Sequence, residues 1–359
     1  TILLTGEFIR SEATLAWSEN VIEMDDGDSK ASLLPVAGTQ FEFDENGYFE
    51  SGVITSEAGW RGDGSPQRYG MQHTMQTGAR DEKSVVSEYS FNAKVTPNDT
   101  WAFNFDIQYV DSTMEIEDVS VMGATRAVVG LDLSGSGLPG VSIYHPGYDG
   151  GTENASSSIA DPSANFWRSA MDHVSDNEGD ELATRFDAEY TFDDGMIKSI
   201  EFGARYSNRE QTTRQSTYNW VVLSEAWAGG NKWYTDSDVA YDTVSFDNFA
   251  RGGVLNNPGG NTFLFPAMDL VHNYAGLNDA LANAKAVDWG WTPLANREGA
   301  TGHFIPKEIN KTEESSTAAY FKVNFEGDIG DYEYSANIGL RYVKLNNDTQ
   351  GFVSYPNDK

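Results

Sequence analysis

Six aromatic side chains with polar neighbours fall in one long stretch of the sequence, about residues 215–310. Flat aromatic rings can stack on the C–H faces of sugar rings, and nearby Asp, Asn and Arg side chains can bond to the sugar hydroxyls. The six residues are Trp220, Trp227, Trp233, Tyr234, Trp289 and Trp291. We interpret the stretch as a candidate carbohydrate-binding surface, although a long loop also uses aromatic side chains for a small core of its own.

Charged residues occur at alternate positions in three other stretches, about residues 181–193, 196–213 and 332–345, which places them on one face of each extended segment. The set combines both signs of charge: Arg185, Asp187, Glu189, Glu201, Arg205, Arg209 and Arg341. Opposite charges on neighbouring strands can form cross-strand ion pairs. We expect these residues to face an aqueous lumen and to have an architectural role.

Sequence patterns of catalysis and metal binding are weak in this chain. The five His residues stand apart and Cys is absent, so a zinc site is not expected. No nucleophile elbow, phosphate loop or dinucleotide fingerprint occurs. Three acidic groups have spacing loosely like calcium loops, without the full twelve-residue pattern: Asp25, Asp26 and Asp28; Asp44, Asn46 and Glu50; and Asp236, Asp238 and Asp242. We expect no enzyme activity, no catalytic residues and no cofactor, with a loop calcium ion as the minor alternative.

The elements that must position these residues follow a repeated pattern. Pairs of strands with alternating apolar and polar residues are joined by short turns such as Asp193-Asp194-Gly195, and long polar loops separate the pairs. The pattern predicts strands at about residues 2–17, 85–96, 100–116, 181–193, 196–213, 315–326 and 332–345. It predicts outer loops at about 18–84, 117–180 and 214–312.

The apolar faces of these strands favour a transmembrane β-barrel over a water-soluble β-sandwich. Tyr, Phe and Trp gather toward the strand ends, with smaller residues such as Ala188 and Ala204 between them, as in the interfacial girdles of membrane barrels. A soluble sheet also alternates, so periodicity alone leaves both folds open. Short turns on one side and long loops on the other indicate an antiparallel transmembrane barrel with its loops outside the cell.

Composition limits the partners. The net charge is −31, which argues against nucleic acid because phosphate binding needs basic stripes. The absence of Cys excludes a disulfide framework. No apolar run approaches the roughly 20 residues of a membrane-spanning helix.

Three hairpins resemble those of TonB-dependent outer-membrane receptors, in particular the large proteobacterial group associated with carbohydrate uptake. They are ATRFDAEYTFDDGMIKSIEFGARYSNRE (183–210), EYSFNAKVTPNDTWAFNFDIQYVDS (88–112) and TAAYFKVNFEGDIGDYEYSANIGLRYV (317–343), the last with a Gly-x-Arg-Tyr pattern. The resemblance implies a bacterial outer-membrane location, contact with membrane lipid, and import of an extracellular nutrient, an oligosaccharide, with energy delivered by the TonB complex.

Such receptors have a plug domain and a barrel of about 22 strands. Neither a plug nor a TonB-coupling segment is recognisable in this sequence, so we expect about seven strands from the interior of a longer receptor. A passive porin-like channel and a secreted acidic carbohydrate-binding or adhesive β-sandwich protein remain alternatives at this point. The resemblance lies in the strands, whereas the loops, which differ between such receptors, would select the particular ligand.

Overall fold

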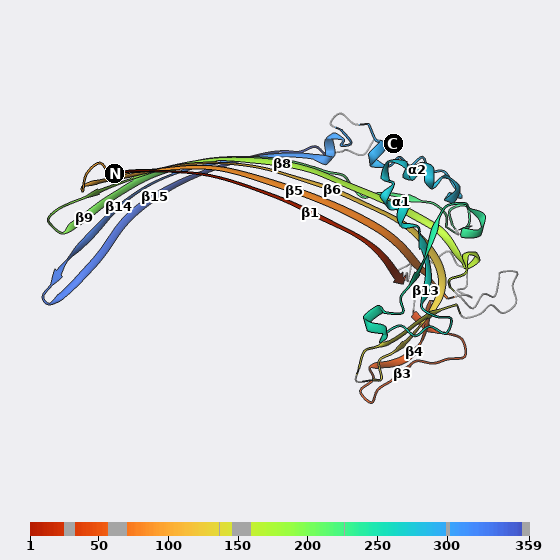
Figure 1. Cartoon of the computed structure of the whole chain (residues 1–359). Coiled ribbons are helices and arrows are strands. Elements are labelled where there is room, and N and C mark those ends of the chain that lie inside the picture. Colours follow the sequence, from red (N-terminus) through yellow and green to blue (C-terminus); the bar gives the residue numbers. More distant parts are fainter. Residues whose placement is uncertain are drawn as a thin grey trace.

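The computed structural model describes residues 1–24, 33–56, 70–135, 137–145, 159–225, 227–298 and 302–353. Seven long strands form one curved antiparallel sheet (Figure 1). In sheet order they are β1 (Ile2–Met24), β5 (Met71–Val95), β6 (Trp101–Asp132), β8 (Asn165–Thr191), β9 (Ile197–Gln215), β14 (Ile309–Ile329) and β15 (Tyr332–Gln350). The prediction of an all-β antiparallel fold is confirmed.

Short turns join the strands at one end of the sheet, which we call the turn end. In the turn between β5 and β6, the side-chain oxygen of Asn98 accepts hydrogen bonds from the backbone N–H groups of Thr100 and Trp101. Gly195, with φ +105°, supplies a left-handed residue in the turn between β8 and β9. The Asn and Gly turn residues therefore set the pairing register of the hairpins.

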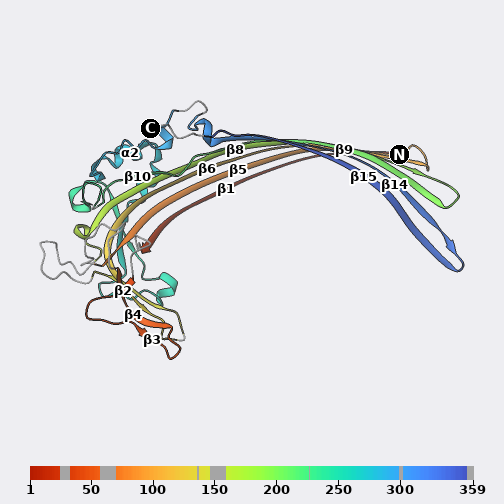
Figure 2. The same cartoon turned by 180° about the vertical axis from the view of Figure 1, so that it is seen from behind.

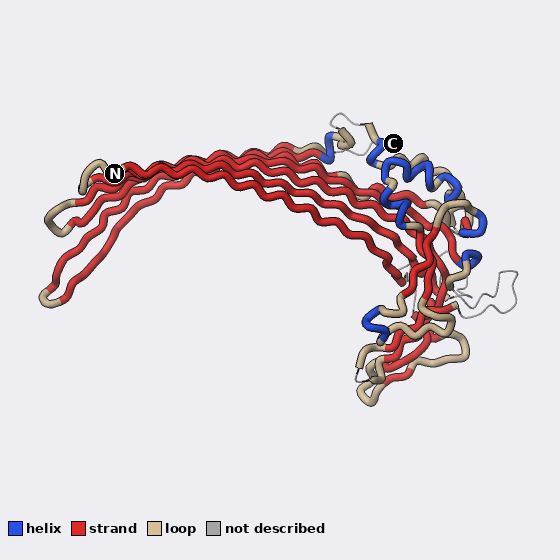
Figure 3. The backbone as a smooth tube through the Cα atoms, viewed as in Figure 1, coloured by secondary structure: helices blue, strands red, loops and turns tan. Residues whose placement is uncertain are grey.

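Long connections cross the opposite end of the sheet, which we call the far end. They contain β2 (Leu33–Pro35), β3 (Glu42–Phe43), β4 (Phe49–Ser56), β7 (Gly140–Tyr144), β10 (Asn219–Val222), β11 (Lys232–Trp233), β12 (Tyr241–Ser245) and β13 (Thr262–Pro266). The helices are α1 (Met268–His272), α2 (Leu277–Ala280) and the single turns η2 (Pro162–Ala164), η3 (Tyr234–Asp236), η4 (Phe249–Gly252), η5 (Tyr274–Gly276), η6 (Ala282–Ala284), η7 (Leu294–Asn296) and η8 (Pro306–Glu308). Figures 2 and 3 show the helices gathered at this end.

The long strands reach much farther than the alternating pattern predicted. β5 begins at Met71 instead of near residue 85, β6 continues to Asp132, and β8 begins at Asn165. The expected outer loops 18–84, 117–180 and 214–312 are correspondingly wrong in part, because they include these strand segments. Met71 to Met75 are all buried, so both faces of the strand are covered and the sequence does not alternate there.

The main core lies at the far end of the sheet. Val119 and Val121 on β6 pack with Leu270, Leu277 and other apolar residues of the 216–308 connection. Side chains two apart on a strand share a face, so these valines lie on the face that carries Phe105 and Tyr109. We call this the apolar face, and the opposite face, which carries Arg185 and Arg205, the polar face.

At the turn end the apolar face is uncovered by any described residue. Two neighbouring rows of cross-strand partners are apolar over all seven strands, and together they define the apolar band. The rows are Ile2, Val95, Phe103, Ala188, Phe202, Phe321 and Leu340, and Leu4, Ala93, Phe105, Phe186, Ala204, Ala319 and Tyr342. Most of their larger members are exposed, with Phe202 at 38% and Leu340 at 78%, while Phe103 is half-buried.

A row of charged and polar residues on the same face separates the apolar band from the far-end core. This acidic row consists of Arg10, Ser87, Asp111, Asp180, Glu210, Glu313 and Asp348. It lies about 26 Å along the strand from the row containing Phe103, at roughly 3.3 Å per residue. From the turn end to the far end, this face therefore carries the exposed apolar band, the acidic row and the covered far-end core.

β1 and β15 are the edges of the described sheet, and each pairs with one neighbour only. Within the described residues the sheet therefore does not close on itself. No helix among them is both long and apolar enough to cross a membrane.

Candidate functional site

The six aromatic residues of the 216–308 connection separate into a buried and an exposed group. Tyr234 and Trp291 are only 2% and 8% exposed and belong to the far-end core, so the expectation that they contact a ligand is wrong. Trp233 is half-buried, and its ring meets Phe166 edge-on at 5.6 Å. Trp220, Trp227 and Trp289 are 58%, 43% and 56% exposed, so these three remain candidates for stacking on a sugar.

The segments that carry the three exposed Trp residues are bonded to one another. The backbone N–H of Ala286 donates to the carbonyl oxygen of Leu223 at 2.8 Å. The indole N–H of Trp291 donates to the carbonyl oxygen of Asn219 at 3.3 Å. The three rings therefore project from neighbouring segments on one folded unit at the far end of β8.

Asp172 on β8 anchors this unit to the sheet. Its carboxylate accepts hydrogen bonds from the Tyr274 hydroxyl at 2.7 Å, the Asn219 side-chain amide at 2.7 Å and the Leu294 backbone N–H at 2.5 Å. Burial raises the pKa of the Asp172 carboxyl, and the three hydrogen bonds oppose that shift. The sequence provides no signal for this role because acidic residues are abundant throughout the chain.

On the polar face, Asp187 is the centre of a second bonded group. The Arg185 guanidinium lies 2.7 Å from the Asp187 carboxylate, two residues along the same strand. The Tyr320 hydroxyl donates to the same carboxylate at 2.8 Å from β14, crossing β9 above Gly203. A Cβ atom at Gly203 would lie 2.6 Å from the Tyr320 ring, so only glycine leaves room for this crossing.

A cross-strand ion pair occurs at Glu201, but its partner is Lys322 and not one of the predicted arginines. The Lys322 ammonium lies 3.0 Å from the Glu201 carboxylate, and the Asn324 amide donates to the same oxygen at 2.7 Å. We expected an arginine to form the cross-strand ion pair, but Lys322 forms it with Glu201. Glu189 is the register partner of Glu201 on β8.

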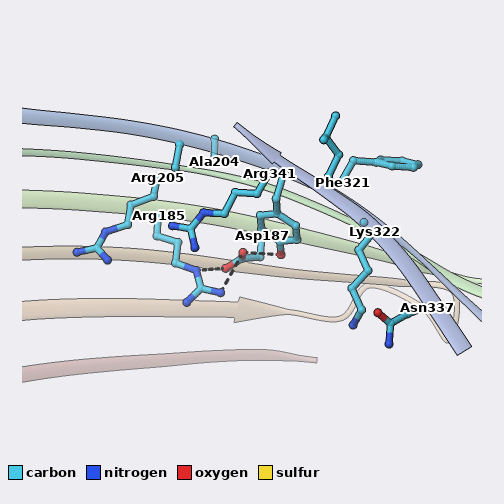
Figure 4. A pocket seen from close by; sticks show the side chains of 12 residues that line it. Arg185, Asp187, Ala204, Arg205, Phe321, Lys322, Asn337 and Arg341 are labelled. Carbon is cyan, nitrogen blue, oxygen red and sulfur yellow. Dashed lines mark hydrogen bonds and ion pairs between the residues drawn. The ribbon is translucent and has the colours of Figure 1, made fainter. Parts of the chain in front are cut away.

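The remaining predicted arginines differ in their surroundings. Arg209 has Glu181 and Glu314 as its cross-strand partners. Arg205 and Arg341 line an open hollow together with Arg185, and all three side chains lie on the same side of the sheet (Figure 4). Sequence alternation placed these residues on one face correctly, but it did not reveal Tyr320, Gly203 or Lys322 as their neighbours.

The acidic groups considered for calcium serve local structure where they are described. Asp44 accepts hydrogen bonds from the backbone N–H groups of Asn46 and Tyr48, which forms a turn. Asp242 accepts from the Met268 N–H and Asp238 from the Asn283 amide. The group at residues 25–28 lies outside the described residues. Over the described part of the chain, no three His, Asp or Glu side chains are grouped to hold a metal.

Comparison with known proteins gives no relative to guide the assignment. No protein-family model, curated protein or solved structure matches the chain. The two faces of the sheet, the exposed aromatic residues and the hairpin resemblance are therefore the features that bear on function.

Proposed function

We propose that this chain forms part of a bacterial outer-membrane receptor. In this proposal the receptor binds an extracellular oligosaccharide and imports it with TonB-coupled energy. The coupling to TonB is inferred from the resemblance of the three hairpins. The membrane location is inferred from the physical properties of the sheet.

The apolar band is the observation that carries the proposal. Soluble monomers rarely expose a contiguous apolar patch of more than a few hundred Å². Here apolar partners continue across all seven strands, and most of the larger side chains are exposed. Contact with lipid acyl chains would remove this surface from water, at about 25 cal/mol per Å² of apolar area.

The opposite face suits a water-filled interior. Alternate strand positions there carry Arg185, Asp187, Glu201 and Lys322, and a charge pointing into the middle of a bilayer costs about 2–4 kcal/mol. The edges also fit an arc of a larger barrel, because unpaired backbone groups of β1 and β15 would be costly in lipid. Further strands pairing with both edges would satisfy them.

The exposed Trp residues at the far end supply a surface for the nutrient. If the apolar band lies in the membrane, the far end projects beyond the acidic row into the extracellular medium. Trp220, Trp227 and Trp289 then lie where an arriving oligosaccharide would meet the receptor. Stacking of sugar rings on these side chains is the contact we propose.

Single-cysteine labelling in cells that express the protein tests the membrane assignment, since the chain has no native Cys. With a membrane-impermeant maleimide, we expect Trp289→Cys to react, and Ala204→Cys on the apolar band to resist labelling until detergent is added. Ser207→Cys, on the polar face of the same strand as Ala204, is the matched control and should react with a small hydrophilic maleimide. Equal reaction of Ala204→Cys and Ser207→Cys in intact membranes would contradict the proposal.

Uptake of a labelled oligosaccharide tests energy coupling. Import should stop when the proton-motive force is dissipated, while binding at the cell surface persists. Continued import without the proton-motive force would favour a passive channel. Recovery of the protein from the medium without detergent would favour a secreted β-sandwich protein.

A further inference from the structure

Arg205 and Arg341 have no charged or hydrogen-bonding partner among the described residues. The whole chain has 55 Asp and Glu residues against 24 Lys and Arg, so acidic partners are plentiful. Arg185, Lys322 and Arg214 all form ion pairs. Arg209 and Arg251 also form no ion pair within the described part of the chain, but only Arg205 and Arg341 line one hollow together.

The register of the strands increases the positive charge around Arg205. Its cross-strand partners are Arg185 on one side and Ala318 on the other. Like charges directly opposite each other destabilise a sheet unless a counter-charge lies between them. Arg209, two rows away, instead has a Glu as its register partner on both sides.

The same short sequence pattern contains Arg205 and Arg341. Gly203-Ala204-Arg205-Tyr206 on β9 and Gly339-Leu340-Arg341-Tyr342 on β15 place a glycine and an arginine on the polar face. The Tyr320 ring occupies the space above Gly203, two residues before Arg205. A Cβ at Gly339 would come within 3.1 Å of the Phe321 carbonyl oxygen, which shows how closely the backbones approach there.

A hollow of about 570 Å³ lies in front of these residues. Its polar lining includes Arg185, Arg205, Arg341, Lys322 and Asn337, and Figure 4 shows Phe321 on the opposite side of the ribbon. This volume falls in the range of about 300–1,000 Å³ that is typical of small-molecule sites. The hollow thus suits a ligand of sugar size better than a single ion.

We propose that this hollow binds a sugar that carries a carboxylate or sulfate group. Arg205 and Arg341 hold the anion through paired N–H donors, the geometry in which guanidinium binds planar oxyanions. Arg185, fixed by Asp187, adds positive charge from the neighbouring strand. The Asn337 amide lines the same hollow and can bond to a sugar hydroxyl.

The identification of the ligand as a sugar rests on the proposed function, whereas the preference for an anion rests on the polar face alone. Binding in detergent tests the anion site, and uptake by cells tests transport. If the protein bound the charged sugar but cells did not import it, the anion site would be supported and the transport proposal would be contradicted.

Isothermal titration of the detergent-solubilised protein with glucuronic acid, glucose 6-sulfate and glucose measures the site directly. We expect saturable binding of one or both charged sugars, weaker binding at higher salt, and no detectable binding of glucose. Arg205→Gln and Arg341→Gln should each weaken binding about tenfold or more, as loss of a charged hydrogen bond predicts. Arg214→Gln, which removes a paired arginine from the apolar face, is the matched control and should leave binding unchanged.

Several outcomes would overturn the inference. Equal affinity for glucose and the charged sugars would show that the arginines do not recognise an anionic group. Binding of inorganic sulfate without either charged sugar would indicate an adventitious ion only. Binding of an acidic peptide in place of the sugars would assign the arginines to a protein contact. Heat-modifiable migration of each variant distinguishes lost binding from lost folding.

Discussion

The apolar face of the sheet has two apolar regions in different surroundings. At the far end, Val119 and Val121 are covered by the 216–308 connection and are fully buried. At the turn end, Phe202 and Phe321 belong to the apolar band and stay exposed. The acidic row lies between the two regions. Side chains of the protein itself cover the far-end region, whereas no described residue covers the apolar band.

This difference explains where alternation is visible in the sequence. In the apolar band, one side of each strand is apolar and the other side is polar, so the residues alternate. At the far end, His73 and Thr74 point to opposite faces, yet both are buried. Apolar and polar residues therefore alternate along a strand only where one face of the sheet is apolar and the other is polar. The alternation is lost where both faces are buried.

The largest expected effect is the removal of a buried ring from the far end. Trp167 is fully buried, and its ring centroid lies 4.4 Å from that of Tyr234. Trp167→Ala should lower the free energy of unfolding by about 4 kcal/mol, measured by denaturant titration in detergent micelles. Phe202→Ala in the apolar band is the control and should cost less than half as much, because detergent can fill the space. Equal losses of unfolding free energy in the two variants would contradict the proposed difference between the far-end core and the apolar band.

A charge placed on the apolar band should have the next largest effect. Ala204→Arg should reduce stability in lipid vesicles by about 3 kcal/mol, because the guanidinium would point at acyl chains. Ser207→Arg, on the polar face of the same strand, should change stability by much less. Folding yields in vesicles and unfolding by urea give both values. If the two variants were equally stable, the apolar band would not face lipid.

Acid should destabilise the far end through His73. Burial lowers the pKa of this His to about 4, from an ordinary value of 6.5. The unfolded chain therefore gains a proton below pH 6.5 while the folded protein does not, so stability falls as pH falls from 6.5 toward 4. Between pH 6.5 and 5 the loss should be about 2 kcal/mol. His73→Gln should remove this part of the slope, and an unchanged slope would contradict the assignment.

The smallest effect concerns the polar face beneath the apolar band. Tyr320→Phe removes the hydroxyl that donates to Asp187 and should cost about 1.5 kcal/mol in urea unfolding. Tyr332→Phe is the control, since Tyr332 is 80% exposed at the tip of the last hairpin. A cost as small as that of the control would show that the polar face contributes little to the stability of the strands.

The candidate sites were accessible to sequence reasoning only in part. Alternation placed Arg185 and Arg205 on one face, as the structure has them. It could not show that they are direct cross-strand partners, because register depends on pairing between strands far apart in sequence. The Trp-rich stretch was identified, but composition could not separate exposed Trp289 from buried Trp291.

The strands of the turn end, their antiparallel order through short turns, and the separation of an apolar from a polar face can all be read from the sequence. These features are local, because a turn and a period of two require only neighbouring residues. The extent of the strands, the aromatic rings that remain exposed, and the hollow that Arg205 and Arg341 share with no ion-pair partner among the described residues emerge only in the folded protein. Those features depend on contacts between residues distant in the chain, and no local pattern records them.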